Sequence, residues 1–454
     1  MARGQRVSVD DSAGLAAWPR PALGWYSVVL LMLGYAFGVV DRIVVGLLVD
    51  PIRTDLALTN TQMGIIQGVA FGLFYALFAI PVGMLVDRWR RVPVLWLGLS
   101  LWSFATISCG LAGSFAGLFA ARVAVGAGES STTPGSASMI ADYFPPAQRA
   151  KAYGVFNMGG SVGIGVAYLL GGTAIQYASV VQQSLPSSLA GLREWQIVFM
   201  MVGAPGLLLA LLMIVTLREP ARRGLVKATA KLSLGPLWRE LKVNGVALAA
   251  VMLGTIMNVM IINAKLGWFP TYFNRVHHWP REKIAHVMAL VQTPLGLFSA
   301  LSAGWVLAWW IRRGRSDGPI LVMAVQCAVW AVFGPLTVFA PTPVLTLAYH
   351  VVTSLFATWA ITAALTALNE MTPNPLRGQI VALYAALTAL VGIGLGPYLV
   401  GVLMDHVFID VGGVAPSLAV VCAAGGILGI VILLSGRASY AAAVQRARAW
   451  GDVV

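Results

Sequence analysis

Four ionisable side chains stand inside stretches of sequence that are otherwise strongly apolar. Asp41 and Arg42 are adjacent, about two-thirds of the way along an apolar run from residue 24 to 48, which is long enough to cross a bilayer as a helix. Arg122 and Glu129 lie seven positions apart in a second such run. Seven residues make nearly two helical turns, so these two side chains would share one face, about 10 Å apart along the axis.

The chemistry open to these residues follows from where they lie. A charge near the bilayer centre costs roughly 2.5–3.5 kcal/mol on insertion scales, so such residues persist only where they face a cavity or a partner. An acid in a low-dielectric cavity can carry a proton, and we therefore predict proton coupling at Asp41 and Glu129. An arginine there can hold an anion, so we predict that Arg42 and Arg122, together with Glu129, bind the substrate.

Two alternatives remain open at this point. The four groups could form a structural ion-pair network that locks helices together. Adjacent residues point about 100° apart on a helix, so Asp41 and Arg42 should have different partners. The sequence does not decide whether Glu129 pairs with Arg42 or Asp41 pairs with Arg122.

The second half of the chain is poorer in charge. Its one deeply placed cation is Lys265, which we assign to the substrate site together with Asn258 and Gln292, although Lys265 could instead snorkel to an interface. Asn263 and His350 are also polar, and each such residue could simply bridge helices at about 0.6 kcal/mol. A charged half facing a mostly apolar half suits an amphiphile better than a sugar.

Composition restricts the class of protein. Of 454 residues 58% are hydrophobic and 10% are charged, and the mean hydropathy is +0.81. Soluble domains are about one-quarter charged, so a soluble enzyme, a disordered chain and a nucleic-acid-binding protein are excluded as first interpretations. The net charge of +13 comes from basic clusters between apolar runs, as the positive-inside rule requires. The three cysteines imply no disulfide framework.

Hydropathy predicts an all-α polytopic membrane protein. Twelve runs are long enough to cross a bilayer: 24–48, 61–86, 93–112, 114–143, 151–174, 195–217, 245–268, 282–309, 319–339, 344–370, 379–404 and 416–435. Most of the 30 Lys and Arg residues fall in the connections on the side of the two termini. Both termini are therefore expected to be cytoplasmic, in a multi-pass protein of the plasma membrane, which we take to be a bacterial inner membrane.

An internal repeat divides the chain. Segments 142–149 and 370–377 both read acid-x-x-Pro-x-x-x-Arg, and segments 162–165 and 391–394 both read Val-Gly-Ile-Gly, at nearly the same offset. Two homologous six-helix bundles are therefore expected. The predicted organisation is an N-terminal tail (1–20), a first bundle (21–217), a basic cytoplasmic linker (218–244), a second bundle (245–436) and a C-terminal tail (437–454).

The loop Gly83-x-x-x-Asp87-Arg88-x-x-Arg91, Arg122-x-x-x-Gly126 and the repeated halves resemble the major facilitator superfamily over nearly the whole chain. A narrower resemblance, to the spinster-like branch, rests on three segments: Val40-Asp41-Arg42, Gly126-Ala-Gly128-Glu129 and Ala141-Asp142-Tyr-Phe. The resemblance to that branch implies export of lysophospholipids or sphingosine 1-phosphate.

The resemblance implies a secondary transporter in which two pseudo-symmetric bundles rock about a midplane site. It also implies a cytoplasmic gate that consists of Asp87, Arg88 and Arg91, with Asp142 beside Arg149 and Glu370 beside Arg377 as matching charge relays. The expected substrate is a lipid-like amphiphile driven by protons, while sodium coupling and a carrier for small organic anions or drugs stay open. A transport-inactive sensor is the alternative outside transport.

Enzymatic chemistry is not expected. Gly159-Gly-Ser161-Val-Gly163 matches a hydrolase motif but lies within a predicted membrane helix, and no phosphate-binding loop or metal-ligand spacing occurs. We expect no cofactor apart from the proton as coupling ion. The expected partners are the bilayer and the substrate, with no nucleic acid, and the chain is expected to be a monomer.

Overall fold

Backbone groups in lipid can be satisfied only within helices or closed barrels, and every regular element here is a helix. The computed structural model describes residues 18–187, 191–223, 234–373, 376–409 and 413–451, and it contains no strand among them. The predicted tails and linker therefore lie partly outside the described residues. The first half contains α1 (Pro21–Leu47), α2 (Val49–Asp55), α3 (Asn60–Gly64), the π-helical η1 (Ile65–Val69), α4 (Ala70–Arg88), α5 (Arg91–Cys109), α6 (Phe115–Glu129), α7 (Thr132–Tyr143), α8 (Pro146–Ser184) and α9 (Glu194–Thr216).

The second half has a matching series of helices. It contains α10 (Leu234–His277), α11 (Arg281–Arg312), α12 (Gly318–Val338), α13 (Pro343–Ser354), α14 (Trp359–Met371), α15 (Arg377–Leu387), the π-helical η4 (Thr388–Ile393), α16 (Gly394–His406), α17 (Val414–Ser435) and α18 (Arg437–Gly451). Helix α10 begins inside the range that we assigned to the linker, and α18 occupies most of the predicted C-terminal tail.

The predicted twelve-span architecture is confirmed. Among the described residues, eleven helical segments are long and apolar enough to cross a membrane. The twelfth consists of α6 and α7, which are separated by a break at Ser130 and Ser131. The hydroxyl groups of these two serines donate to the carbonyl oxygens of Ala127 and Gly128. Helices α13 and α14 form a similarly interrupted span in the second half.

The same local devices recur in both halves. Ser114 caps α6 by accepting from the Gly117 N–H, and Thr342 caps α13 by accepting from the Leu345 N–H. A side-chain cap of this kind satisfies one of the free N–H groups at a helix start. These caps stand at equivalent places in the sequence repeat.

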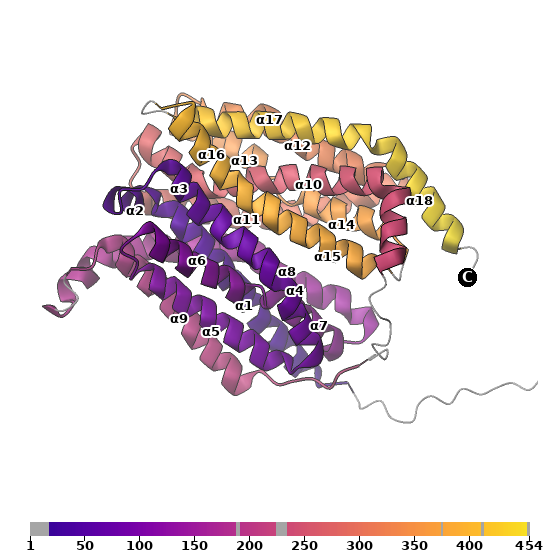
Figure 1. The fold of residues 1–454 in the computed structure, drawn as a ribbon, viewed down its shortest axis with the longest axis horizontal. Coiled ribbons are helices and arrows are strands. Elements are labelled where there is room, and N and C mark those ends of the chain that lie inside the picture. Colours follow the sequence, from indigo (N-terminus) through magenta and orange to yellow (C-terminus); the bar gives the residue numbers. More distant parts are fainter. Residues whose placement is uncertain (1–17, 188–190, 224–233, 374–375, 410–412, 452–454) are drawn as a thin grey trace, which may run out of the picture.

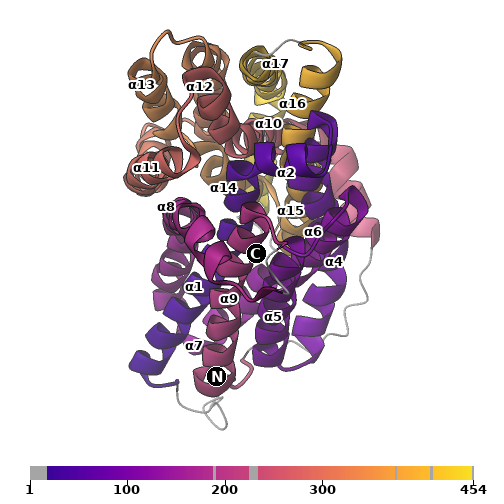
Figure 2. The same cartoon turned by 90° about the vertical axis from the view of Figure 1, so that its left-hand side faces the viewer.

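The two halves form two bundles that lie side by side, with α1–α9 below α10–α18 in Figure 1. The face that carries α2 and the start of α3 is here called the far side, and the face that carries α18 is called the termini side. The far side is on the left in Figure 1 and faces the viewer in Figure 2.

The hydrophobic cores show where the halves are joined. One large core contains buried residues of both halves, such as Val44 and Ile66 with Met260 and Phe273. Two further cores each belong to one half and include Leu95 in the first half and Met323 in the second. Apolar packing therefore unites the bundles toward the far side, while the termini-side parts pack separately.

Span 2 (α3, η1 and α4) and span 11 (α15, η4 and α16) belong to different bundles and pack closely against each other. Here η1 and η4 lie at the crossing of the two spans, and backbone atoms approach through glycines. A Cβ at Gly64 would stand 2.6 Å from the carbonyl oxygen of Pro397, so only glycine fits at this position. This seam fixes the relative position of the two bundles.

Candidate transport site and gates

The centre of the site is an ion pair between α1 and α6. Arg42 donates from Nη2 to Glu129 Oε1 at 2.6 Å, and the two side chains are 21% and 4% exposed. Gly38, one turn before Arg42, makes room for this contact because a Cβ there would collide with the Glu129 carboxylate. The guanidinium is therefore the accessible partner and the carboxylate the buried one.

Aromatic side chains surround this ion pair, and the sequence pattern did not predict them. The buried Phe71 ring lies 4.8 Å from the Arg42 guanidinium and 5.8 Å from that of Arg122, a cation–π arrangement with two cations. Tyr35 and Tyr75 lie close enough to the ion pair for the charges of Arg42 and Glu129 to act on the two phenol groups. Tyr35 precedes Arg42 by two helical turns on the same face, and this spacing could have revealed it.

Asp41 and Arg122 are the second acid and the second cation of the site, but they form no ion pair with each other. Asp41 is buried beside the Thr106 hydroxyl, and Arg122 is the charged group that acts on it most strongly. Arg122 is fully buried, and none of its three guanidinium nitrogens has a hydrogen-bond partner among the described residues. The structure thus pairs Glu129 with Arg42 and places Asp41 near Arg122, which the sequence left undecided.

Two of the residues assigned to the second half point into that half. Lys265 is 5% exposed, so it does not snorkel, and its Nζ donates to Thr353 Oγ1 at 3.0 Å. The ammonium also lies over the Phe269 and Trp330 rings, at 5.1 and 4.9 Å. Asn258 is fully buried and donates to the Gly254 carbonyl oxygen at 2.9 Å.

Gln292 occupies a different place, near the other bundle. Its amide lies 3.0 Å from the ring of His350, which stacks on Phe269 with ring centroids 4.4 Å apart. Gln292 is half-buried, and its neighbour Thr293 packs against Gly165 of α8 in the first half. Of the three residues assigned to the second half, Gln292 is thus the one that lies beside the first half.

On the termini side, Arg91 is the organising residue. It is fully buried, forms an ion pair with Asp142, and donates to Glu219 at 2.7 Å and to the Pro220 carbonyl at 2.7 Å. Burial raises the pKa of Glu219, but hydrogen bonds from the Val92 N–H and the Arg91 guanidinium outweigh it, and the pKa lies below its ordinary value. All of these contacts stay within the first half and the start of the linker.

Among the described residues, the remaining gate residues make local contacts or none. Asp87 and Arg88 are exposed, and their side chains bond to no other described residue. Arg149 donates to the Phe144 carbonyl at 3.1 Å, and Arg377 makes the equivalent bond to the Thr372 carbonyl at 3.0 Å.

The two acids of the repeated motif have partners other than their own arginines. Glu370 accepts from the Tyr440 hydroxyl of α18 at 3.0 Å, and Asp142 pairs with Arg91. Neither Arg149 nor Arg377 therefore bonds to the acid of its own segment.

A polar seal joins the bundles on the far side, and the sequence pattern did not predict it. Arg275 of α10 forms an ion pair with Asp50 of α2 at 2.6 Å. Asp405 of α16 accepts from the Asn60 side chain at 2.7 Å and from the Thr61 N–H at 2.6 Å. Every hydrogen bond that the structure describes between the halves belongs to this seal. The only sequence signal was the presence of acids at the far-side ends of spans.

The sequence profile of the Major Facilitator Superfamily matches residues 31–397. The chain belongs to this superfamily. Among solved structures, a bacterial homologue of the human lysosomal transporter spinster in an inward-facing, unoccupied conformation superimposes with a TM-score of 0.77, at 24% identity, over 94% of this chain and 98% of that chain. The occupied, inward-facing form gives a TM-score of 0.76 at 25% identity, with the same coverage. The expected resemblance to the spinster-like branch is confirmed in the fold.

Curated members of the superfamily with similar sequences carry several kinds of name. The probable galactarate/D-glucarate transporter GudP of Bacillus subtilis (strain 168) is 29% identical over 219 residues, which is 47% of this chain and 45% of that protein. An MFS-type efflux pump of Mycolicibacterium smegmatis is 25% identical over 402 residues, covering 87% and 88% of the two chains. Protein spinster of Drosophila melanogaster is 28% identical over 155 residues, which is 34% of this chain and 26% of that protein. The superfamily consists of transporters rather than enzymes.

Proposed function

We propose that this superfamily member is a proton-coupled secondary transporter for a single-chain amphiphile with an anionic or zwitterionic head, of the lysophospholipid or sphingosine-phosphate type. The observation that carries the proposal is the unequal exposure of the central ion pair. The Arg42 side chain is 21% exposed, whereas that of Glu129, its carboxylate partner, is 4% exposed. A proton on Glu129 would break the ion pair and leave Arg42 free to bind an anionic head group.

Coupling follows from competition at Arg42. When Glu129 is ionised it occupies the guanidinium, and when it is protonated the substrate can take its place. Asp41 and Arg122 form a second acid–arginine set in the same low-dielectric region, so the two acids, Asp41 and Glu129, should share the coupling proton rather than act singly. Proton and substrate would then bind together at one site, which couples their movement across the membrane.

The second half supports an apolar wall for the chain of the amphiphile. Lys265 and Asn258 direct their polar atoms into their own bundle, so neither adds a hydrogen-bonding group to the seam between the bundles. Gln292, whose neighbour Thr293 packs against α8 of the first half, forms a polar pair with His350. A hydrocarbon chain would gain about 0.8 kcal/mol for each methylene group that it buries there.

The excess of Lys and Arg on the termini side supports a cytoplasmic placement of both termini in the plasma membrane. With that orientation the far-side seal closes the external face, and the described state is inward-facing. The likeness to inward-facing spinster homologues supports the same assignment. The exposed Asp87 and Arg88 would then form the cytoplasmic gate only after the bundles rock closed. We propose a monomer as the working unit.

A second candidate substrate is a small organic anion. The name of the Bacillus subtilis relative, a sugar-acid transporter, favours it, and Arg42 would bind a carboxylate as readily as a phosphate. The two candidates differ in their demand on the apolar wall. Only an amphiphile gains affinity as its chain lengthens.

The deciding experiment measures binding to purified protein of a monoacyl phospholipid series of increasing chain length and of galactarate. We expect affinity to rise with chain length. Arg42→Ala should weaken binding of the anionic lipids by about tenfold or more, since charge-assisted hydrogen bonds are worth roughly 1.5–3 kcal/mol. Arg90→Ala is the matched control because Arg90 is exposed and far from the ion pair. Chain-length-independent binding together with tight galactarate binding would replace the amphiphile by the organic anion.

A further inference from the structure

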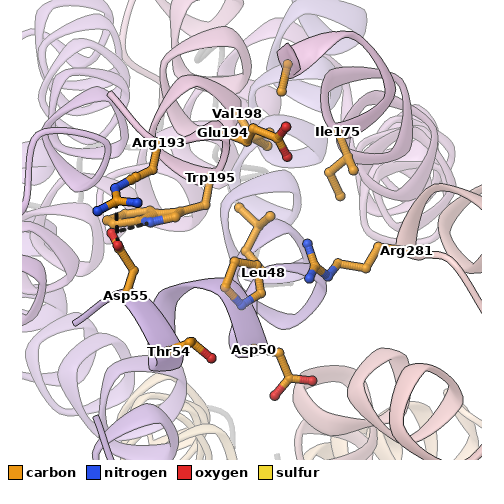
Figure 3. A pocket seen from close by; sticks show the side chains of 12 residues that line it. Leu48, Asp50, Thr54, Asp55, Ile175, Arg193, Glu194, Trp195, Val198 and Arg281 are labelled. Carbon is orange, nitrogen blue, oxygen red and sulfur yellow. Dashed lines mark hydrogen bonds and ion pairs between the residues drawn. The ribbon is translucent and has the colours of Figure 1, made fainter. Parts of the chain in front are cut away.

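A cavity opens on the far side, away from the central ion pair. It has a volume of about 520 Å³, within the range of roughly 300–1,000 Å³ that small-molecule sites occupy. Its floor is made of apolar side chains that are buried or partly buried, and its rim is charged (Figure 3). The floor contains Leu48, Ile175, Ala178, Trp195 and Val198.

Most of the charges on the rim already have protein partners. Asp50 is held by Arg275 at 2.6 Å. Asp55 accepts from the Trp195 indole N–H at 3.0 Å and pairs with Arg193 at 3.2 Å. These three ionic groups are therefore not available to a ligand without loss of a contact.

Two opposite charges on the rim have no partner among the described residues. Glu194 of α9 and Arg281 of α11 make no side-chain hydrogen bond or ion pair with any described residue. Both side chains extend toward the same opening from different walls of the cavity (Figure 3). Glu194 belongs to the first bundle and Arg281 to the second.

We infer that this far-side cavity is a second binding site, for a single-chain amphiphile whose head group is zwitterionic. The ammonium group of the ligand would lie at Glu194, its phosphate or carboxylate at Arg281, and its chain on the apolar floor. The site is independent of Arg42 and does not require the proposed transport function.

Occupancy of this site has a conformational consequence. A ligand that contacts both Glu194 and Arg281 links the two bundles on the face where the polar seal already joins them. Such a ligand binds the far-side-sealed state better than any state in which the bundles have separated there, so it shifts the population toward the sealed state. Addition of the amphiphile from the far side alone should then slow turnover.

The test uses a monoacyl phosphocholine with a photoactivatable group at the end of its chain and the full-length protein in detergent. We expect cross-links in two peptides, one that contains Ile175 and Ala178 of α8 and one that contains Val198 of α9. The double variant Glu194→Gln, Arg281→Gln should lose them, and each single change should weaken binding by roughly tenfold. Neutral single-chain detergents and head groups without a chain should compete poorly.

Three control variants show whether the cross-links arise from this cavity. Lys283→Gln and Glu282→Gln remove charges from neighbouring far-side positions that do not line the cavity, and both should retain the cross-links. Arg42→Ala should also retain them, even if it abolishes binding at the central site. Cross-links that persist in the double variant, or that map only to the central helices, would overturn the inference.

Discussion

Arg42 and Glu129 meet at 2.6 Å across α1 and α6, and the carboxylate is the buried member of the pair. A buried carboxylate held by one arginine can be neutralised only by that arginine or by a proton. The arginine, by contrast, can exchange this partner for an external anion. On the proposed function, protonation of Glu129 would therefore free Arg42 for a substrate anion.

Glu129→Gln should uncouple binding from pH. In the wild type, affinity for an anionic amphiphile should rise as pH falls, because protonation of Glu129 releases Arg42. The glutamine is permanently neutral, so its binding should be strong and flat with pH, while accumulation driven by a pH gradient in proteoliposomes should be lost. Asp41→Asn is the companion variant, since the proton can belong to the set of acids.

Glu282→Gln serves as the control for this prediction, because Glu282 lies at the start of α11, far along the chain from the ion pair. It should leave both the pH profile and the accumulation unchanged. Normal gradient-driven accumulation in Glu129→Gln and in Asp41→Asn would contradict the coupling role of these acids.

Arg91→Ala should destabilise the folded protein. The change removes the shared partner of Asp142 and Glu219 and leaves two carboxylates without a counter-charge. Breaking a buried pair in this way costs about 3–5 kcal/mol, and we expect a loss near the lower end because Glu219 is partly exposed. Unfolding titrations in micelles measure the loss, and Arg90→Ala should change stability by less than about 0.5 kcal/mol.

Asp405→Ala should weaken the far-side seal. It removes the acceptor for the Asn60 side chain and the Thr61 N–H, so the population should shift toward states that open on the far side. Spin-label distances across that face should lengthen.

Asp87→Asn tests the opposite face. If Asp87 closes the termini side after the bundles rock, this change should favour states that are open on the termini side. Spin-label distances that are identical in both variants would argue against gating at either place.

Docking of α18 should depend on pH through Asp317. Arg437 donates to this carboxylate at 2.6 Å and Arg315 at 3.2 Å. Partial burial raises the pKa of Asp317, but these hydrogen bonds outweigh it and hold the pKa below its ordinary value of 3.8. A depressed pKa stabilises the folded form above about pH 4, and this contribution is lost as pH falls.

Hydrogen exchange of α18 amides should therefore accelerate below about pH 4 relative to α17, after correction for intrinsic rates. Asp317→Asn should remove the pH dependence and leave α18 loosely held at every pH. Exchange that is equally slow across this range in both proteins would show that α18 is held by its other contacts, such as the packing of Tyr440 and its hydrogen bond to Glu370.

Much of the architecture could be read from local pattern. Spans of about 20 apolar residues, the repeat at 142–149 and 370–377, and the charges at Asp41, Arg42, Arg122 and Glu129 are properties of short windows. A bilayer converts such windows into helices because lipid offers no other partner to the backbone. The spans, their number and the residues worth testing could therefore be determined without coordinates.

Pairing and direction were decided only by the tertiary structure. That Lys265 turns into its own bundle, that Asp142 meets Arg91 rather than Arg149, and that Asp50 and Asp405 seal the far side depend on which helices pack together and on how each is rotated. An apolar helix carries little record of its rotation when most of its faces are hydrophobic, as in α9 and α17. Rotation is set instead by close packing between helices, such as the glycine seam between span 2 and span 11, and these contacts join residues hundreds of positions apart.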